Sequence, residues 1–442
     1  MVRFYLLAFV VLCLLTSCAY SPTIQPQINS LSIANKHEAA IRILENSQVN
    51  YGEQNQLLYL MDYGLLLHYA GRFEESISVF EEAKREYDRL FTTSLSKEAG
   101  TWLVNDNVSP YRGEDFERVM INIFQAVNYA KTGDINEALV EARDVDSLLR
   151  AMNEQYDDGQ KNLYVEDAFA RFFMGLLYEM AGTFEYQNDA YISYKKAWGI
   201  YQGLFQPLYG VGAPDILKEN LLYLSKKFDP TDDPFYQKEF AGIDIKKLDR
   251  RQNKAEIIIV HYKGLSPVKN QTTIVIPYGA GRLAKLAFPK YVKREVDNSP
   301  SRCEIVSQNG QRIIAVMEIA HDITKIAVQN LECRKLRIQA KSTIRSVGKA
   351  VASYYVEDAV RRSSGDTGGD LFRYAGSLYN LSSEQADLRS WQTLPASIEV
   401  SRVLLEPGDY KIYFNGKFIS QKQWKAGERD LVVIRSAQWQ YD

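Results

Sequence analysis

The sequence predicts an α+β fold, in which a solenoid of repeated helix pairs precedes a mixed β-sheet domain that carries an embedded helical segment. Through the first half of the 442-residue chain, apolar residues recur at helical spacing and one signature repeats three times. A segment rich in proline and aspartate then breaks the helical pattern. Beyond it, apolar residues recur at a spacing closer to two, as they do in strands. The expected parts are a signal peptide (1–17), a lipidated tether (18–30), the helical repeats (31–228), a linker (229–254) and a β-rich domain (255–442).

The N-terminus has the pattern of a bacterial lipoprotein signal peptide. Arg3 precedes an apolar run, residues 4–15, which is shorter than the ~20 residues that a helix needs to span a bilayer. Ser17 is small enough for a signal-peptidase site, and the Cys18 thiol after it can take a diacylglyceryl group. We therefore expect a mature chain that begins at Cys18 and is held to a membrane by its acyl chains. The alternative is a cleavable signal with an incidental cysteine.

The three helical repeats share a small residue in the first helix, a glycine in the turn and alanine in the second helix. The small residue lets the partner helix approach to ~8–10 Å, and glycine adopts the backbone conformation that ends a helix. Each pair then buries its apolar face by stacking on the next pair. The spacing is that of a tetratricopeptide (TPR) helix pair, and the third copy has three residues inserted after its turn. The three copies are Gly64, Gly71, Ser76 and Ala83; Ala126, Gly133, Ala138 and Val145; Gly175, Gly182, Ala190 and Ala197.

The repeats lie farther apart than the ~34-residue TPR period. An insertion at residues 92–115 interrupts the solenoid, either as a functional segment or as a cover over one helix. Residues 36–45 are typical of a further second helix, and residues 214–228 of a capping helix.

Five segments of the C-terminal half are typical of strands, because they are rich in β-branched and aromatic residues. Pro407-Gly408 and Asn415-Gly416 are turn signals between them, the second typical of a hairpin. Helical periodicity at residues 319–362 predicts a long helix or helical hairpin inside this domain. The expected strands are residues 255–262, 271–276, 397–405, 409–414 and 430–434.

The charge balance gives no support to nucleic-acid binding. The chain has 53 basic and 55 acidic side chains, so it produces no strong positive field. If Cys13 is removed with the signal peptide and Cys18 carries lipid, Cys303 and Cys333 are the remaining thiols. In an oxidising compartment they predict one disulfide, with two separate thiols as the alternative.

A concave wall along the first helices of the repeats is the first candidate site. The TPR frame places a largely apolar set of residues there, which can accept a helix or an extended peptide of a partner. The alternative is that the insertion or the C-terminal domain of the same chain fills the groove. The groove residues are Met61, Leu65, His68, Tyr69, Ile123, Val127, Lys131, Phe172, Leu176 and Glu179.

A basic face on the embedded helix is the second candidate site. Its residues recur every three or four positions, and Leu336, Ile344, Val347 and Val351 on the opposite side should pack inward. On a membrane-tethered protein such a face suits anionic headgroups or a polyanionic polymer. A plain solvated face is the alternative. The residues are Arg334, Arg337, Lys341, Arg345 and Lys349.

Catalytic and metal-binding motifs are missing from the sequence. The chain has no nucleophile elbow, no Walker loop and no paired-cysteine metal motif, and its four histidines have no mutual spacing that indicates a site. We expect no cofactor and no metal, and no catalytic residue can be assigned. The alternative is a catalytic acid and base formed by two carboxylates from distant segments of the chain.

Four motifs carry a resemblance to a family. Residues 110–119 (PYRGEDFERV), 133–143 (GDINEALVEAR), 264–269 (GLSPVK) and 389–396 (RSWQTLPA) are similar to a largely uncharacterised family of bacterial TPR-containing outer-membrane lipoproteins. The resemblance spans nearly the whole mature chain and implies an envelope location, without a known activity. Ala19 stands where inner-membrane lipoproteins usually have aspartate, which resembles the outer-membrane sorting pattern.

The first functional hypothesis is a lipid-anchored scaffold or accessory subunit at the periplasmic face of the outer membrane, which binds another envelope protein through its TPR-like repeats. The second is an enzyme that acts on cell-wall or surface polysaccharide, for which two carboxyl groups ~5–9 Å apart would be evidence. The third is a structural subunit of an envelope machine, for which stoichiometric copurification would be evidence.

Overall fold

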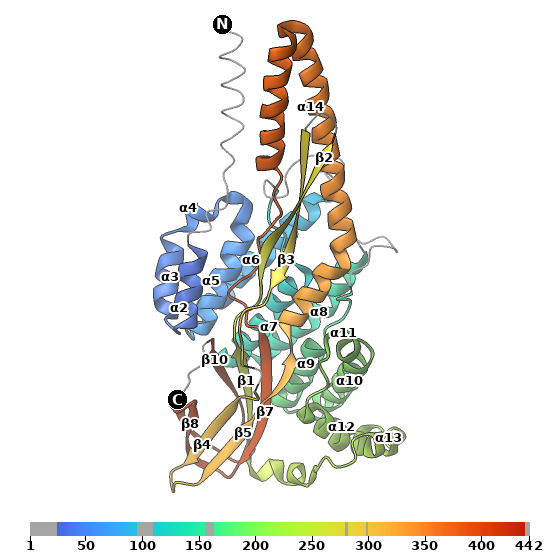
Figure 1. The fold of residues 1–442 in the computed structure, drawn as a ribbon. Coiled ribbons are helices and arrows are strands. Elements are labelled where there is room, and N and C mark those ends of the chain that lie inside the picture. The colour runs from blue at the N-terminus through green and yellow to red at the C-terminus, as the bar shows by residue number, and fades with distance from the viewer. Residues whose placement is uncertain (1–23, 95–108, 155–162, 279–281, 298, 438–442) are drawn as a thin grey trace.

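The computed structural model describes residues 24–94, 109–154, 163–278, 282–297 and 299–437. It confirms an α+β protein with a helical first half and sheets in the second half (Figure 1). The predicted signal peptide and the predicted lipidation site, Cys18, lie outside the described residues. The helices of the first half are α2 (Gln25–Ile33), α3 (His37–Glu45), α4 (Gln48–Tyr51), η1 (Glu53–Asn55), α5 (Gln56–Tyr69), α6 (Phe73–Ser94), α7 (Asp115–Thr132), α8 (Ile135–Glu154), α9 (Ala168–Ala181), α10 (Phe184–Ile200), η4 (Tyr201–Phe205), α11 (Gln206–Tyr209) and α12 (Asp215–Phe228).

The helices α5 to α10 pack as the three pairs α5–α6, α7–α8 and α9–α10. Gly71, Gly133 and Gly182 lie in the turns of these pairs with φ of 76°, 91° and 79°, a region that L residues with a Cβ rarely adopt. At Gly64 an added Cβ would lie 2.7 Å from the Phe80 ring of α6. Glycine therefore permits both the turn and the close approach of the two helices.

The predicted tether and linker are both shorter than expected. The helix α2 already begins at Gln25, and Ile28 within it is buried, so residues 25–30 belong to the folded part. The predicted linker contains α13 (Asp233–Glu239) and the 3₁₀ helix η5 (Lys246–Asn253), and Arg251 of η5 is buried. The expected capping helix is confirmed as α12, which packs on α10.

The strands form three sheets, with the orders β10-β1-β7-β6, β2-β3 and β5-β4-β8-β9. The pair β1–β10 is parallel, whereas the other ladders are antiparallel. All five expected strands are confirmed, as β1, β2, β7, β8 and β10. Their bounds are β1 (Ala255–Lys263), β2 (Val268–Tyr278), β3 (Arg282–Val292), β4 (Arg302–Ser307), β5 (Arg312–Val316), β6 (Glu318–His321), β7 (Ser397–Leu405), β8 (Gly408–Phe414), β9 (Lys417–Trp424) and β10 (Arg429–Ser436).

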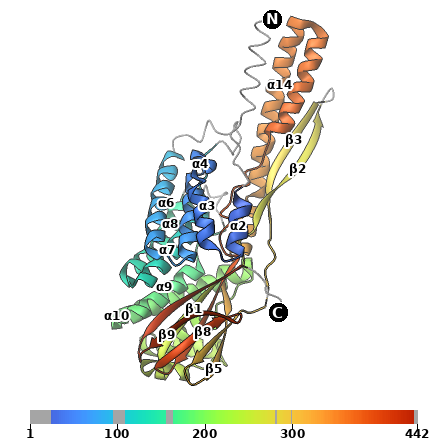
Figure 2. The ribbon, with the colours of Figure 1, turned by 90° about the vertical axis from the view of Figure 1, so that its left-hand side faces the viewer.

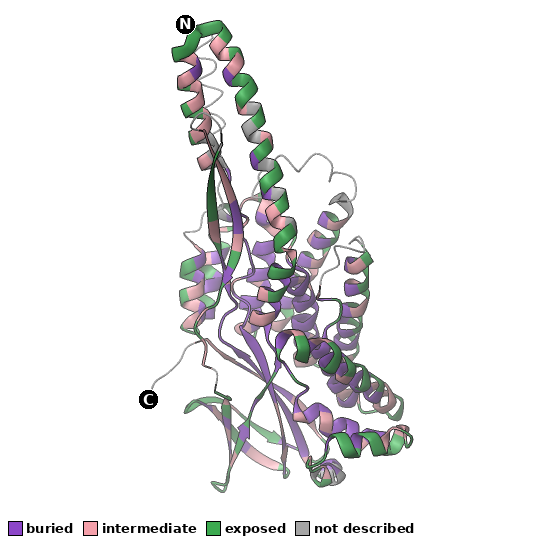
Figure 3. Ribbon diagram, turned by 45° about the vertical axis from the view of Figure 1, so that its right-hand side comes forward, coloured by how far each residue is buried: buried purple, intermediate pink, exposed green. Residues whose placement is uncertain are grey.

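Strand β1 is buried on both faces, which explains its unbroken apolar run. Ile258 and Tyr262 belong to the large core shared with the helices, whereas Ile257 and Ile259 belong to a second core shared with β4 and β8. The sheet β10-β1-β7-β6 is thus the middle layer, with helices on one face and the second four-stranded sheet on the other. Buried residues concentrate in this centre (Figure 3).

An arm formed by β2, β3 and α14 (Ile323–Ser383) projects from the body (Figures 1 and 2). The helical segment was predicted at residues 319–362, but residues 318–321 form β6 and the helix continues to Ser383. Gly365 has non-helical angles, φ 76° and ψ −176°, and divides α14 into two helices. The expected helix ends too early because glycine is a weak helix former, and Gly365, Gly368 and Gly369 follow Ser364.

Candidate functional site

The predicted groove is part of the protein interior. Eight of its ten residues are buried, and Tyr69 and Lys131 are partly buried. The groove residues Met61, Leu65 and Val127 share one hydrophobic core with Ile258 of β1 and Leu431 of β10. The alternative in which the chain fills its own groove is therefore correct, and the expectation of an open partner groove is wrong.

Polar contacts hold the sheet, and the segment that precedes β7, in this groove. The Lys131 ammonium donates to the Leu431 carbonyl at 2.8 Å, and the Tyr69 hydroxyl donates to the Thr393 carbonyl at 3.3 Å. The His68 ring lies 5.4 Å from the Tyr262 ring, measured between centroids. Burial lowers the pKa of His68 to about 4, so this imidazole is neutral in the core.

Glu179, the last groove residue, belongs to a buried ion cluster between the helices and the sheet. Arg251 lies 2.9 Å from Glu179 and 2.8 Å from Glu256 of β1. Arg402 of β7 also pairs with Glu256, at 2.9 Å, and Arg429 of β10 pairs with it at 3.1 Å. The cluster neutralises charges that would otherwise be costly to bury.

The predicted polyanion face has one member with a described side chain, Arg334, and it faces the body. Its guanidinium pairs with Glu114 before α7, and Lys269 of β2 pairs with the same carboxylate at 2.6 Å. The side chains of Arg337, Lys341, Arg345 and Lys349 lie outside the described part of the structure. Arg334 therefore holds the base of the arm against the helices, and is not an open anion contact.

The apolar side of α14 faces solvent, which reverses the prediction. Ser342 and Ser346 lie against β3 instead: the Ala287 amide donates to the Ser342 hydroxyl at 3.3 Å, and the Ser346 hydroxyl donates to the Lys285 carbonyl at 2.6 Å. Among the strands that the structure describes, β3 pairs with β2 alone, so its other edge has backbone groups that need partners. The serines supply these partners, and this contact turns the opposite side outward.

We call the exposed set on the first half of α14 the apolar stripe. Its members recur at helical spacing, with Leu336 at 80% and Val347 at 55% relative exposure. Several large exposed apolar side chains along one side of a helix are typical of an interaction site. The second half of α14 also exposes Leu371, Tyr374 and Leu378. The stripe consists of Leu336, Ile344, Val347, Val351, Tyr354 and Tyr355.

The predicted disulfide is absent, and both thiols are free. Cys303 is buried in β4, where its Sγ donates to the Tyr413 carbonyl at 3.4 Å, and burial raises the pKa of its thiol to about 12. Cys333 is exposed on α14. The two residues belong to different layers of the fold, so their separation along the chain carried no information about a bridge.

A polar cavity of about 400 Å³ opens at the end of the middle sheet, beside β8 of the second sheet. Ser436 forms part of its wall. Behind this wall, His261 contacts both the Ser436 hydroxyl and the Glu399 carboxylate. Sequence reasoning missed this group because it searched for histidines near one another, whereas the partners come from three separate strands.

Among the described residues, no helix is both long and apolar enough to cross a membrane. Within the same part of the chain, no group of histidine, cysteine and acidic side chains is arranged to hold a metal ion. Comparison with known proteins gives no family model that matches the chain and no curated protein that matches its sequence.

Proposed function

We propose that the protein is an envelope lipoprotein, anchored through Cys18 at the periplasmic face of the outer membrane, which binds another envelope protein as an accessory or scaffold subunit. The lipoprotein-type N-terminus supports the anchor. We also infer that the three helix pairs are TPR-like repeats, supported by glycine at each turn and small residues at the close approaches. In this proposal the repeats form a platform for the sheet, and the partner binds elsewhere.

The apolar stripe is the observation that carries the proposed contact. The middle sheet packs on the helix pairs, whereas the stripe is exposed on an arm that projects from the body (Figures 1 and 3). Ile344, Val347 and Val351 follow helical spacing, so an amphipathic helix can pack along them. The occupant we propose is such a helix of another envelope protein.

Lipid anchoring predicts a loss of membrane association in Cys18→Ala. The variant has no thiol for the diacylglyceryl group, so it should stay unprocessed or leave the membrane fraction after extraction. Mass spectrometry of the wild-type mature N-terminus should show an acylated cysteine. A wild-type N-terminus without acyl groups would refute the proposed anchor, whatever the behaviour of the variant.

The stripe predicts a site-specific crosslink to the partner. A photo-crosslinking amino acid at Val347 should give one adduct with another envelope protein, and the same group at Val49, 91% exposed on α4, should not. Adding Val351→Glu should reduce the adduct at least about tenfold, because a buried interface residue of this kind contributes ~2 kcal/mol or more. Thermal unfolding should stay nearly unchanged, since Val351 is exposed.

Two outcomes would contradict this assignment. Equal adducts from positions 347 and 49 would show that the stripe has no specific partner. An adduct only between two copies of the chain would show that the stripe is a self-association surface. Because both positions are exposed valines on helices, neither outcome can be attributed to a folding defect.

A further inference from the structure

Three polar residues on neighbouring strands meet on one face of the middle sheet. His261 of β1 lies directly opposite Glu399 of β7, and Ser436 at the end of β10 pairs with Lys263, two residues beyond His261. Side chains two residues apart on a strand share a face, so all three project toward the second sheet. There the His261 ring lies 4.7 Å from the Phe414 ring of β8.

The imidazole of His261 lies between the hydroxyl of Ser436 and the carboxylate of Glu399. The Ser436 Oγ lies 2.7 Å from His261 Nε2, and the Glu399 Oε2 lies 2.9 Å from His261 Nδ1. This is the arrangement in which serine hydrolases activate a hydroxyl: the imidazole takes its proton, and the carboxylate fixes the tautomer and stabilises the imidazolium. A buried neutral imidazole needs a partner at each nitrogen, and here one partner is a hydroxyl at the cavity wall and the other is a carboxylate on the far side of the ring.

The protonation states suit this role. Burial lowers the pKa of His261, against the opposing effect of Glu399, so the imidazole is neutral and can accept a proton. Burial alone would raise the pKa of Glu399, but hydrogen bonds from His261, Lys263 and Ser301 bring it below its ordinary value. The carboxylate therefore stays ionised, and Lys263 holds its other oxygen at 2.8 Å.

The cavity determines what can reach Ser436. Its wall is formed by Ser436 together with charged residues of both signs, a polar residue and one aromatic residue: Lys263, Arg302, Glu295, Asp297, Asn415 and Phe414. Charged walls suit a short acyl group and oppose a long alkyl chain, whose methylenes would desolvate these charges. His261 is fully buried behind Ser436, so the serine is the member of the three that a ligand contacts.

We propose that Ser436 is a nucleophile that accepts a short acyl group from an ester or thioester in this cavity. The Ser436 Oγ forms a bond to the acyl carbon while the bond from that carbon to the leaving oxygen or sulfur breaks and its electron pair departs with the leaving group. The hydroxyl proton passes to His261 Nε2, and Glu399 stabilises the resulting imidazolium. The imidazolium then gives this proton to the departing oxygen or sulfur, or to water where the leaving group departs as a stable anion, and becomes neutral again. Water then attacks the acyl-serine, releases the carboxylic acid and restores the hydroxyl.

The burial of His261 predicts that the second step is slow. Water reaches the buried imidazole only past the acylated Ser436, so general-base assistance to hydrolysis is hindered. We therefore expect the acyl form to accumulate. With 4-nitrophenyl acetate, whose phenolate leaves without prior protonation, the purified protein should release about one equivalent of 4-nitrophenolate in a burst, followed by a slower steady state.

The test combines this burst with peptide mass spectrometry. The wild-type protein should carry acetyl on the peptide that contains Ser436, and Ser436→Ala should lose the burst while keeping its melting temperature. His261→Gln should acylate ~100-fold or more slowly, as loss of a general base does. Ser420→Ala, a serine of β9 outside the cavity, is the matched control and should behave as wild type. 4-nitrophenyl octanoate should react much more slowly than the acetate.

Wild-type labelling makes the proposal refutable without any variant. Acetylation of Ser436 no faster than that of Ser420 in the wild-type protein would show that His261 and Glu399 do not activate the hydroxyl. A burst of unchanged size in Ser436→Ala would place the nucleophile elsewhere. Neither result would affect the proposed partner contact, because the arm and this cavity share no residue.

Discussion

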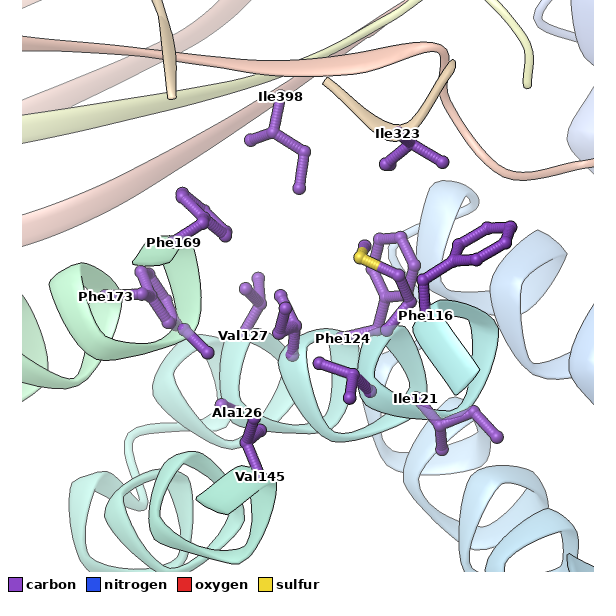
Figure 4. Packing of buried hydrophobic residues seen from close by; sticks show 14 of the residues in the cluster. Phe116, Ile121, Phe124, Ala126, Val127, Val145, Phe169, Phe173, Ile323 and Ile398 are labelled. Atoms are coloured by element: carbon purple, nitrogen blue, oxygen red, sulfur yellow. The ribbon is translucent and has the colours of Figure 1, made fainter. Parts of the chain in front are cut away.

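Val127→Glu is expected to lower the free energy of unfolding by several kcal/mol and to produce a large fall in melting temperature. Val127 on α7 is 1% exposed, and its side chain lies in the core between the helices and the sheet, on the side of Ile398 and Phe169 (Figure 4). A glutamate there would bury a carboxylate without a partner, which is among the most costly single substitutions. Thermal unfolding followed by circular dichroism measures the change.

Val140→Glu on α8 is the matched control, because it makes the same substitution on the second helix of the same pair. Val140 is 43% exposed, so its carboxylate stays hydrated and the effect should be within ~0.5 kcal/mol. If Val127→Glu instead unfolds like Val140→Glu, the groove is open to solvent and the packing described above is wrong. The comparison thus separates a filled groove from a free partner site by stability alone.

Local signals predicted the helix pairs α5–α6, α7–α8 and α9–α10 well, because each pair depends on residues close in sequence. Gly71 and Phe73 specify a turn and a helix start within a few positions, and Gly64 faces Phe80 of the next helix. What fills the groove was not predictable in this way. Leu431 contacts Lys131 from 300 positions away, and a hydrophobic pattern on α7 is the same whether a partner or a distant strand covers it.

The side of α14 that packs against the protein was predicted wrongly for a similar reason, since a distant strand decides it. Periodicity distinguishes two sides of a helix, one with Ile344 and Val347 and one with Ser342 and Ser346, but it does not state which side packs. The open edge of β3 decides this, because its backbone groups need hydrogen-bond partners that hydroxyls supply and alkyl groups cannot. This edge was not predicted, because β3 itself was not among the expected strands.

The group of Ser436, His261 and Glu399 shows what spacing rules omit. Strand register brings these residues together, and register depends on the pairing of β1 with both β10 and β7. The one available signal was a set of polar residues at positions where buried strands usually carry apolar side chains. His261 directly follows the apolar run from Ile257 to Val260, and Glu399 is a buried charged residue of β7.

Glu256→Gln is the second substitution with a large expected effect, because it removes the central negative charge of the buried ion cluster. Arg251, Arg402 and Arg429 all pair with this carboxylate. The isosteric amide keeps the volume but leaves buried guanidinium groups without sufficient counter-charge. Removal of one partner from such a buried group typically costs ~3–5 kcal/mol, which chemical denaturation should detect as a lower midpoint at unchanged slope.

The effect should also depend on pH in a defined direction. Burial alone would raise the pKa of Glu256, but the three arginines lower it to about 2. A carboxyl whose pKa is lower in the folded than in the unfolded state adds stability above its unfolded pKa, and this stability is lost as the pH falls through its folded pKa. The difference between wild type and Glu256→Gln should therefore be full near pH 7 and shrink steadily from about pH 5 toward pH 2.

Glu406→Gln provides the control for charge removal at an exposed pair. Glu406 lies 3.0 Å from Lys254, with the glutamate side chain 70% exposed, so its loss should change the stability by no more than ~1 kcal/mol. Equal small effects of Glu256→Gln and Glu406→Gln at pH 7 would show that solvent reaches the cluster. A large effect of Glu256→Gln that stays constant down to pH 3 would show that the loss comes from packing, and that the arginines do not hold the carboxylate ionised.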